Sequence, residues 1–387
     1  MASSAEAGER RIMFLEADDR SFLSRSLPLA LALKAKGIRV GAALGRGEVR
    51  TEIEAAGIEY YPVRFRRGNL NPFLELATLW SVYQAYRDFA PHMVQQITFK
   101  PIVLGTMAAR AAGVHQIVNK VTGLGFVFTG RGFKQRLLRP IAEAGYRSAL
   151  RGKNTRVILL NPDDREYFLA RVLVKPERAQ FVLGEGVDPD RFAPTPEPAG
   201  VPSVLFPSRM LTDKGLPELI EAARMLKGEG VKFRLVLAGL PDPENPASCD
   251  EAQLQAWQEE GLAEWVGFQK DMPALLAAAH IVCLPSHREG LPVSLLEAAS
   301  CGRPIVTTDA PGCREVVKDG HNGLVVPLRD PSALATALGR LIGDPTLRSE
   351  FGRNGRAMVL EQFSMEQMVS RTLALYEEVM GTGFLAS

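Results

Sequence analysis

The sequence has little cysteine. Its only four thiols are those of Cys249, Cys283, Cys301 and Cys313, and no two of them have C-x-x-C spacing. This scarcity disfavours a disulfide framework and a structural zinc site, and it predicts a reduced, cytosolic protein. The five histidines also lack the spacing of metal ligands, so no metal and no cofactor are expected.

Long apolar runs are missing as well. No stretch of 18 apolar residues occurs among the 387 residues, so no transmembrane helix is expected. The first ten residues, MASSAEAGER, lack the apolar core of a signal peptide. The strand that follows leads into EADDRS and not into G-x-G-x-x-G, which argues against a nicotinamide oxidoreductase.

Net charge is almost absent, but its distribution is uneven. The 46 Lys and Arg residues against 44 Asp and Glu residues give a formal charge of +2, which by itself disfavours a polyanionic partner. Residues 1–195 hold 29 basic and 19 acidic residues, a net charge of +10. Residues 196–387 hold 17 and 25, a net charge of −8. The two halves therefore differ in the surfaces they can attract.

Short apolar, β-branched runs alternate with segments of helical spacing along the chain. Such continuous apolar strands are typical of parallel sheets that helices cover on both faces. The alternation stops at residues 188–202, where five prolines in fifteen residues prevent a helix or a central strand and predict a linker. It then restarts. We therefore expect an α/β protein of two doubly wound domains, with ligands bound in a cleft between their facing strand ends.

The most informative stretch follows the apolar strand at residues 281–285. Pro292 is suited to the first turn of a helix, whose free backbone N–H groups attract an anion. Those N–H groups are expected near Gly290, Leu291 and Val293. Glu297 lies in an otherwise apolar helix and needs a partner, for which a ribose diol is suited. Glu289 is at the tip of the loop. A solvated Glu289 and a Glu297 paired at a domain interface remain the alternative.

A second signal follows the strand SVLFPS. Ser208 and Arg209 leave the strand end, and Lys214 precedes a helix that starts near residues 216–217. Two cations on a strand-to-helix connection can both contact a diphosphate placed at the start of the helix. Two solvated loop cations are the alternative.

Taken together, these signals resemble the donor-binding domain of GT-B glycosyltransferases, specifically glycosyltransferase family 4. Glu289 and Glu297 match the two-glutamate signature of the family, with seven residues between the acids, and Arg209 and Lys214 match its basic pair. The sequence PIVTTDAPGCREVVKDGHNGLVVP, which follows, resembles the family in detail. The resemblance covers essentially the whole C-terminal half.

The resemblance implies a retaining hexosyltransferase that uses a nucleotide-sugar donor, most simply a UDP-sugar, without a metal. Glu297 would hold the ribose hydroxyls and Glu289 the donor sugar, while Arg209 and Lys214 would neutralise the departing diphosphate. The remaining donor-binding residues would be Ser208, Gly290, Leu291 and Val293. The D-x-D sequence of residues 188–190, known from metal-dependent transferases of another fold, is interpreted here as a turn.

The N-terminal half resembles family members that extend glycans on polyprenyl-diphosphate carriers. The expected acceptor-side residues are Asp19, Arg25, Gln96, Thr98, Lys100, Gly123 and Gly125. Two departures stand out: Arg25-Ser26 replaces a common His-Arg, and Gln95-Gln96 replaces a common His-His. The role of that strand-end histidine in donor binding therefore cannot be carried over, and Gln96, Thr98 and Lys100 are only positional substitutes.

The segment Lys120–Arg156 carries nine basic residues and one acid, Glu143. Its first part interleaves four apolar residues with arginine and lysine, namely Phe126, Val127, Phe128 and Phe133. Basic residues near an anionic leaflet together with inserted aromatic residues favour a peripheral membrane face. A solvated basic helix with core phenylalanines is the alternative. Nucleic acid would fit the charge, but no recognition motif accompanies it, so none is expected.

We therefore expect a GT-B protein in which residues 1–190 bind the acceptor and residues 200–362 bind the nucleotide-sugar. A C-terminal helix of about residues 363–387 should pack back on the first domain. The expected reaction is transfer to a polyprenyl-diphosphate-linked glycan in surface polysaccharide or glycan assembly, by a cytoplasmic protein peripheral on the inner face of the membrane. A soluble small-molecule acceptor and a non-catalytic nucleotide-sugar-binding protein are the alternatives.

Overall fold

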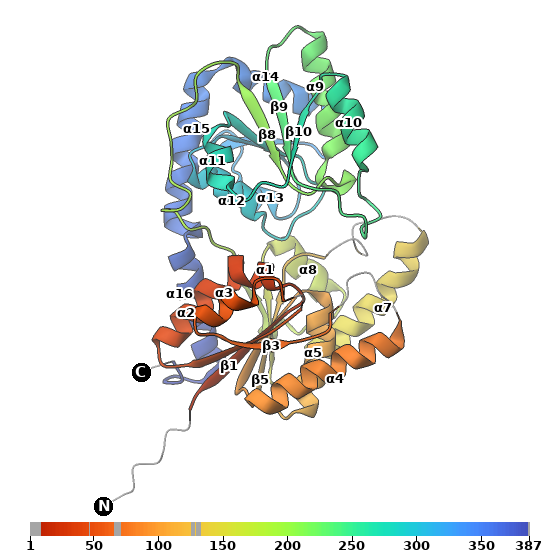
Figure 1. The fold of residues 1–387 in the computed structure, drawn as a ribbon, viewed down its shortest axis with the longest axis vertical. Coiled ribbons are helices and arrows are strands. Elements are labelled where there is room, and N and C mark those ends of the chain that lie inside the picture. The colour runs from red at the N-terminus through yellow and green to blue at the C-terminus, as the bar shows by residue number, and fades with distance from the viewer. Residues whose placement is uncertain (1–8, 46, 66–70, 125–127, 129–132, 386–387) are drawn as a thin grey trace, which may run out of the picture. The chain divides into compact units, whose positions relative to one another are not determined.

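The computed structural model of the protein describes residues 9–45, 47–65, 71–124, 128 and 133–385. The chain forms two compact units. Unit 1 contains the described residues up to Gly184 and those from Val369 onward, and unit 2 is Glu185–Met368. Each unit contains one parallel sheet with helices packed on it (Figure 1).

The sheet of unit 1 has seven parallel strands in the order β3-β2-β1-β4-β5-β6-β7. The strands are β1 Arg11–Glu16, β2 Arg39–Leu44, β3 Glu59–Pro62, β4 Met93–Ile97, β5 Gln116–Val121, β6 Thr155–Leu159 and β7 Ala179–Phe181. The helices are α1 Asp19–Ser21, α2 Leu27–Ala35, α3 Arg50–Ala55, α4 Pro72–Phe89, α5 Phe99–Ala111, α7 Phe133–Leu150 and α8 Pro162–Ala170. The strand order changes direction at β1 and β4, the position at which doubly wound sheets bind ligands.

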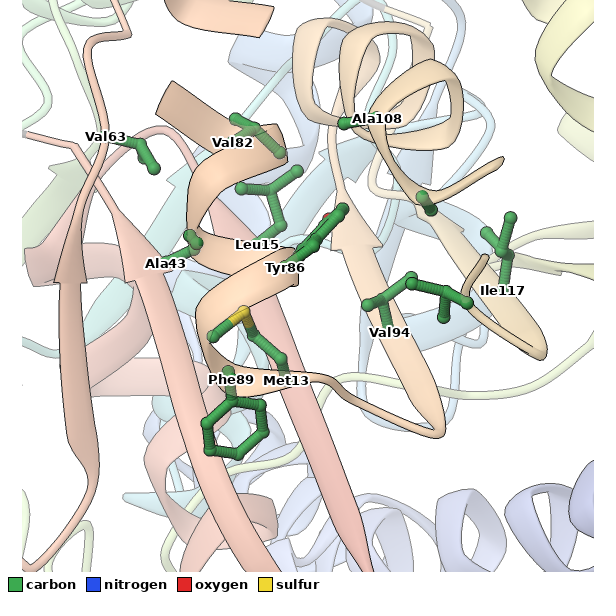
Figure 2. Packing of buried hydrophobic residues seen from close by; sticks show 13 residues of the cluster. Met13, Leu15, Ala43, Val63, Val82, Tyr86, Phe89, Val94, Ala108 and Ile117 are labelled. Carbon is green, nitrogen blue, oxygen red and sulfur yellow. The ribbon is translucent and has the colours of Figure 1, made fainter. Parts of the chain in front are cut away.

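Both faces of this sheet are covered. Figure 2 shows one face, where Met13 and Leu15 of β1 pack against Val82, Tyr86 and Phe89 of α4. The alternate residue of β1, Phe14, points to the opposite face and meets Phe22, with their ring centroids 5.7 Å apart. Continuous apolar strands are required because each residue of the strand meets a core.

The sheet of unit 2 has six parallel strands in the order β10-β9-β8-β11-β12-β13. The strands are β8 Ser203–Pro207, β9 Arg234–Ala238, β10 Glu264–Gly267, β11 Ile281–Leu284, β12 Ile305–Thr308 and β13 Gly323–Val326. The helices are α9 Leu216–Gly228, α10 Glu251–Glu259, α11 Met272–Ala277, α12 Val293–Ser300, α13 Cys313–Val316, α14 Pro331–Gly343 and α15 Pro345–Met358. The predicted class, two doubly wound α/β domains, is confirmed.

The proline-rich segment of residues 188–202 contains no helix or strand and lies along unit 2. Arg348 of α15 forms a two-fold ion pair with Glu197, with N–O distances of 2.6 and 2.8 Å. Arg303 donates to Thr195, and Ser300 donates to the carbonyl of Phe192 at 2.8 Å. The segment is therefore fastened to unit 2, and the change from one unit to the other comes earlier, at residues 184–185.

The last helix, α16 Met365–Met380, connects the two units covalently. Its residues from Val369 belong to unit 1, where the buried Tyr376 hydroxyl donates to the side-chain carbonyl of Gln95 on β4. Among the described residues, no helix combines the length and apolar character needed to cross a bilayer.

Candidate functional site

The donor-side candidates of unit 2 lie in loops that follow adjacent parallel strands. Arg209 and Lys214 follow β8, and Glu289 follows β11, its neighbour in the sheet. Because the carboxyl ends of parallel strands meet at one edge of a sheet, residues far apart in sequence come together here. The Nζ atom of Lys214 lies 2.5 Å from Oε1 of Glu289, although 75 residues separate them. Their side chains are 17% and 13% exposed, so the pair is largely shielded from water.

Close backbone packing holds these two loops together. Gly215, which ends the turn carrying Lys214, has a φ of +75°, and a Cβ atom there would lie 2.0 Å from the carbonyl oxygen of Pro285. The N–H of His287 donates to the carbonyl of Asp213 at 2.9 Å. Only glycine permits this approach, and the approach fixes the separation of Lys214 from Glu289.

The loop after β12 supports Glu289 from another direction. The N–H of Glu289 donates to the carbonyl of Pro311 at 2.9 Å. Gly312 has a φ of +84°, and a Cβ atom there would lie 2.6 Å from the carbonyl oxygen of Glu289. Three consecutive strand ends of the sheet therefore define the position of this carboxylate.

Arg209 is half-exposed and has a partner that the sequence pattern did not single out. Its Nη1 atom lies 2.5 Å from Oδ2 of Asp242, in the loop after β9. That loop pairs with the residues next to Arg209, because Thr212 N–H donates to Ala247 O and Cys249 N–H to Met210 O, both at 2.8 Å. An acid shortly after a neighbouring strand end was the available signal for Asp242.

Helix α12 carries the second glutamate. Glu297 is partly buried and lies one turn after Val293, on the same side of the helix. Gly290 and Leu291 are buried in the approach to the helix, and Ser208 lies at the end of β8, partly exposed. The structure thus brings Lys214 and Glu289 into contact and keeps the other donor-side candidates in the strand-end loops of unit 2 and the helix that follows β11.

A second pair lies beside them. Nε2 of His287 lies 2.9 Å from Oε1 of Glu218, in the first turn of α9, and both side chains are largely buried. Burial raises the pKa of Glu218, but bonds from His287 and from its own backbone, with the charge of Arg329, outweigh burial and hold this pKa below its ordinary value. The sequence pattern did not reveal this pair, because the pairing depends on how two loops pack.

The acceptor-side candidates of unit 1 are not gathered in one cluster. Three of them follow the neighbouring strands β1, β4 and β5, namely Asp19, Thr98 and Gly123. Asp19 is buried: its Oδ2 accepts a bond of 2.9 Å from the N–H of Val49, and its Oδ1 meets no hydrogen-bond donor among the described residues. Arg25 is exposed in a π-helical turn, and Gly125 lies outside the described residues.

Gln96 and Lys100 are occupied within unit 1. Gln96 is buried, its amide donates to the Tyr86 hydroxyl at 3.2 Å, and its carbonyl accepts from Thr106 at 2.9 Å. Lys100 forms an ion pair with Glu75 at 2.6 Å. Both polar atoms of the Gln96 side chain are therefore hydrogen-bonded within unit 1.

Two residues of the segment Lys120–Arg156, which was expected to form a membrane face, contact the interior of unit 1. Lys120 is buried and donates to the carbonyl of Gly184 at 2.5 Å. Phe128 is partly buried and packs against a core cluster, with its ring centroid 6.1 Å from that of Tyr146 and 5.8 Å from that of Tyr167. The expectation that these two residues face a membrane is wrong, because the fold uses them internally. Phe126 and Val127 lie outside the described residues.

Within the described part of the chain, no three His, Cys, Asp or Glu side chains are placed to hold a metal ion. Asp188 forms the predicted turn, since its carboxylate accepts from the N–H groups of Asp190 at 2.9 Å and Arg191 at 3.1 Å. The four cysteines are free and buried, and burial raises the pKa of Cys313 to about 12.

Comparison with known proteins assigns the two halves separately. Residues 11–159 match the family model described as glycosyl transferase 4-like, and residues 188–358 match the one described as glycosyl transferases group 1. The N,N'-diacetylbacillosaminyl-diphospho-undecaprenol alpha-1,3-N-acetylgalactosaminyltransferase of Campylobacter jejuni is 28% identical over 383 residues, which cover 96% of this chain and 99% of that protein. The UDP-Gal:alpha-D-GlcNAc-diphosphoundecaprenol alpha-1,3-galactosyltransferase of Escherichia coli is 24% identical, covering 81% and 82%.

Solved structures show the same fold. Sucrose-phosphate synthase from Thermosynechococcus elongatus aligns with a TM-score of 0.81 at 20% identity, covering 96% of this chain and 99% of that one. Anabaena Alr3699/HepE in complex with UDP aligns with a TM-score of 0.74 at 20% identity, covering 95% and 100%. The predicted resemblance is thereby confirmed: the chain is a glycosyltransferase of the GT-B fold, with a 4-like domain followed by a group 1 domain.

Proposed function

We propose that this glycosyltransferase moves a sugar from a UDP-sugar to a polyprenyl-diphosphate-linked glycan with retention of configuration. The observation that carries the proposal is the group of two cations and two acids in unit 2, of which Lys214 and Glu289 meet across 75 residues of sequence. The names of the Campylobacter and Escherichia relatives support the acceptor class, and the UDP complex of the Anabaena protein supports the nucleotide.

In this proposal Arg209 and Lys214 bind the diphosphate of the donor. Each now pairs with a carboxylate, so the diphosphate exchanges one anionic partner for another and the cations are oriented before it arrives. Glu297 binds the ribose hydroxyls, and Glu289 binds hydroxyls of the donor sugar. The N–H groups of Gly290, Leu291 and Val293, together with Ser208, complete the donor site. Removing one such charged contact typically costs about 2.7–4 kcal/mol of transition-state stabilisation.

The proposed chemistry needs no protein nucleophile. The bond from the anomeric carbon to the diphosphate oxygen breaks, and the acceptor hydroxyl bonds to that carbon on the same face. The leaving phosphate oxygen takes the proton of that hydroxyl. Arg209 and Lys214 stabilise the negative charge that develops on the diphosphate. No metal or cofactor takes part.

The two units would divide the substrates between them. Residues 200–362 would hold the donor, residues 1–190 with the C-terminal helix would hold the acceptor, and the protein would work peripherally at the inner face of the membrane. Asp19 is the strongest acceptor-side candidate, because its Oδ1 is buried at a strand end without a donor among the described residues. Thr98 and Gly123, which follow the neighbouring strands, would line the same edge.

Thermal unfolding in the presence of UDP-sugars tests the donor assignment. A UDP-sugar should raise the Tm of the wild type and should leave the Tm of Arg209→Ala unchanged. Arg224→Ala is the matched control, because Arg224 is equally exposed and ion-paired in the same unit, but lies on α9 away from its first turn. No stabilisation of the wild type by any nucleotide-sugar would overturn the proposal, as would equal responses of the two variants.

Transfer to a polyprenyl-diphosphate-linked sugar, followed by release of UDP, then tests the acceptor class. Product with this acceptor supports the proposal, and product only with soluble sugars refutes its acceptor part.

A further inference from the structure

Helix α4 presents apolar side chains to solvent. Phe73, Leu76 and Trp80 are between 59% and 78% exposed, and their spacing puts them on one side of the helix. The other side of α4 is buried, with Tyr86 and Phe89 in the core shown in Figure 2. Single exposed apolar residues are ordinary, but three on one helical stripe, two of them aromatic, indicate an interaction surface.

Helix α7 also presents apolar side chains to solvent. Leu137 and Ile141 lie one turn apart and are 62% and 65% exposed. One turn further along the same side of α7 lies Gly145, which is close to Phe99 in the first turn of α5. The ring centroid of Phe99 also lies 5.0 Å from that of Tyr146, the next residue of α7. The next residue of α5, Lys100, bonds to Glu75 of α4, between Phe73 and Leu76.

The two apolar rows are therefore neighbours, separated by the start of α5, which packs on both helices (Figure 1). We call the surface formed by Phe73, Leu76, Trp80, Leu137 and Ile141 the α4/α7 face.

The charges around this face are basic. Arg64 is exposed and lies against α4, since its carbonyl accepts a bond of 2.6 Å from Thr78. Arg136 is exposed beside Leu137. The acids of α4, α5 and α7 offer little repulsion: Glu75 is neutralised by Lys100, Glu143 is buried and bonded to Tyr167, and Asp88 lies in the last turn of α4. Residues 1–195, which contain most of unit 1, also carry a net charge of +10.

We propose that the α4/α7 face inserts into the interfacial region of an anionic lipid bilayer. Phe73, Leu76 and Trp80 would enter the boundary between head groups and acyl chains, and Arg64 and Arg136 would lie on lipid phosphates. Aromatic and aliphatic residues flanked by arginine, without compensating acids, are typical of interfacial helices. A protein partner or a second copy of this chain would need polar and acidic groups placed opposite the basic residues of this face. A lipid surface does not need such placed groups.

This inference rests on the proposed function in one respect: a lipid-linked acceptor requires that the enzyme reach a membrane. It differs from the expectation drawn from the sequence in which surface of the protein contacts the membrane. The segment Lys120–Arg156 contributes through the exposed part of α7, whereas α4, which carried no such expectation, supplies most of the apolar surface.

Trp80 is a built-in probe. It is the exposed tryptophan, since Trp257 is buried and Trp265 donates its indole N–H to Gly239 at 2.8 Å. On mixing with phosphatidylglycerol/phosphatidylethanolamine vesicles, the emission of the wild type should shift to shorter wavelength and should be quenched by brominated acyl chains. In Trp80→Phe the shift should disappear while flotation with vesicles persists. Flotation with unchanged, unquenched emission would overturn the proposal.

Flotation of variants measures the contribution of the face. Phe73→Ser and Trp80→Ser should each weaken binding about tenfold or more, because burial of an aromatic side chain is lost. Arg64→Ala with Arg136→Ala should weaken binding to anionic vesicles and reduce its salt dependence. Leu360→Ser, an exposed apolar residue of unit 2, is the control and should bind as the wild type does. Equal binding of all variants would refute the proposal.

Two further readouts keep the outcomes distinct. Self-association in the absence of lipid that Phe73→Ser abolishes would mean that the face joins two copies, and would overturn the lipid assignment. Transfer to a short-chain, water-soluble acceptor should be the same in wild type and Phe73→Ser, because the face lies outside the proposed donor site. Flotation without transfer to any acceptor would refute the proposed function and leave this inference standing.

Discussion

At the scale of single residues, two buried amides on adjacent strands have opposite roles. Gln96 of β4 and Asn119 of β5 are register partners, so their side chains project from the same face of the sheet. Gln96 bonds to both Tyr86 and Thr106, whereas neither polar atom of the Asn119 side chain has a hydrogen-bond partner among the described residues. One amide is part of a satisfied network and the other is not.

This contrast gives a paired prediction. Gln96→Met should lower the free energy of unfolding by about 2 kcal/mol or more, because two buried hydroxyls lose their partner. Asn119→Leu should be neutral or stabilising, because it removes polar atoms that the protein does not satisfy. Urea unfolding of the two variants measures the difference. A large loss of stability in Asn119→Leu would contradict the contrast, and UDP-sugar binding in unit 2 should be the same in both.

At the scale of elements, the Glu218–His287 pair fastens the loop of Glu289 to the start of α9. The pKa of Glu218 is below its ordinary value of 4.5, so the charged carboxylate stabilises the fold above that pH. This contribution is lost as the pH falls through the lowered pKa. The free energy of unfolding of the wild type should therefore fall more steeply below pH 4.5 than that of Glu218→Gln, by at most about 1.4 kcal/mol per pH unit.

Urea unfolding followed at several pH values between 3 and 7 tests this prediction. Glu221→Gln is the control, because Glu221 lies on the same helix but is half-exposed, paired with Arg224. It should show the wild-type slope. Parallel curves for the wild type and Glu218→Gln would mean that the pair does not hold the loop.

The elements themselves could be predicted, while several of their contacts could not. The strands of both sheets appear where apolar, β-branched runs predicted them, because each run must be buried on two faces. Helix α4 carries apolar residues on both of these sides, so periodicity could not separate the Tyr86 side, in the core, from the Trp80 side, in solvent. Asp242 was missed because an ion pair between two loops leaves no periodic signal.

At the scale of the whole molecule, the chain enters unit 2 after Gly184 and returns to unit 1 at Val369. The expectation that a C-terminal helix packs back on the first domain came from the resemblance to glycosyltransferase family 4, and it remains a proposal that this helix belongs to the acceptor domain. The sequence did not reveal how this helix is anchored: Tyr376 is buried, and its hydroxyl donates to the side chain of Gln95 on β4. Gln95 therefore has a structural reason to be present, independent of catalysis.

The returning helix leads to a prediction that separates the two units. Tyr376→Ala should lower the stability of unit 1 by about 3–5 kcal/mol, because it empties a buried aromatic site and leaves Gln95 without its donor. Hydrogen exchange should then rise in β1 and β4 and stay unchanged in β8 and β11. Phe363→Ala, at a buried aromatic residue of unit 2 just before α16 begins, is the matched control and should give the reverse pattern. If both substitutions raised exchange in both sheets equally, α16 would couple the units into one cooperative structure, and the division at Val369 would have no energetic meaning.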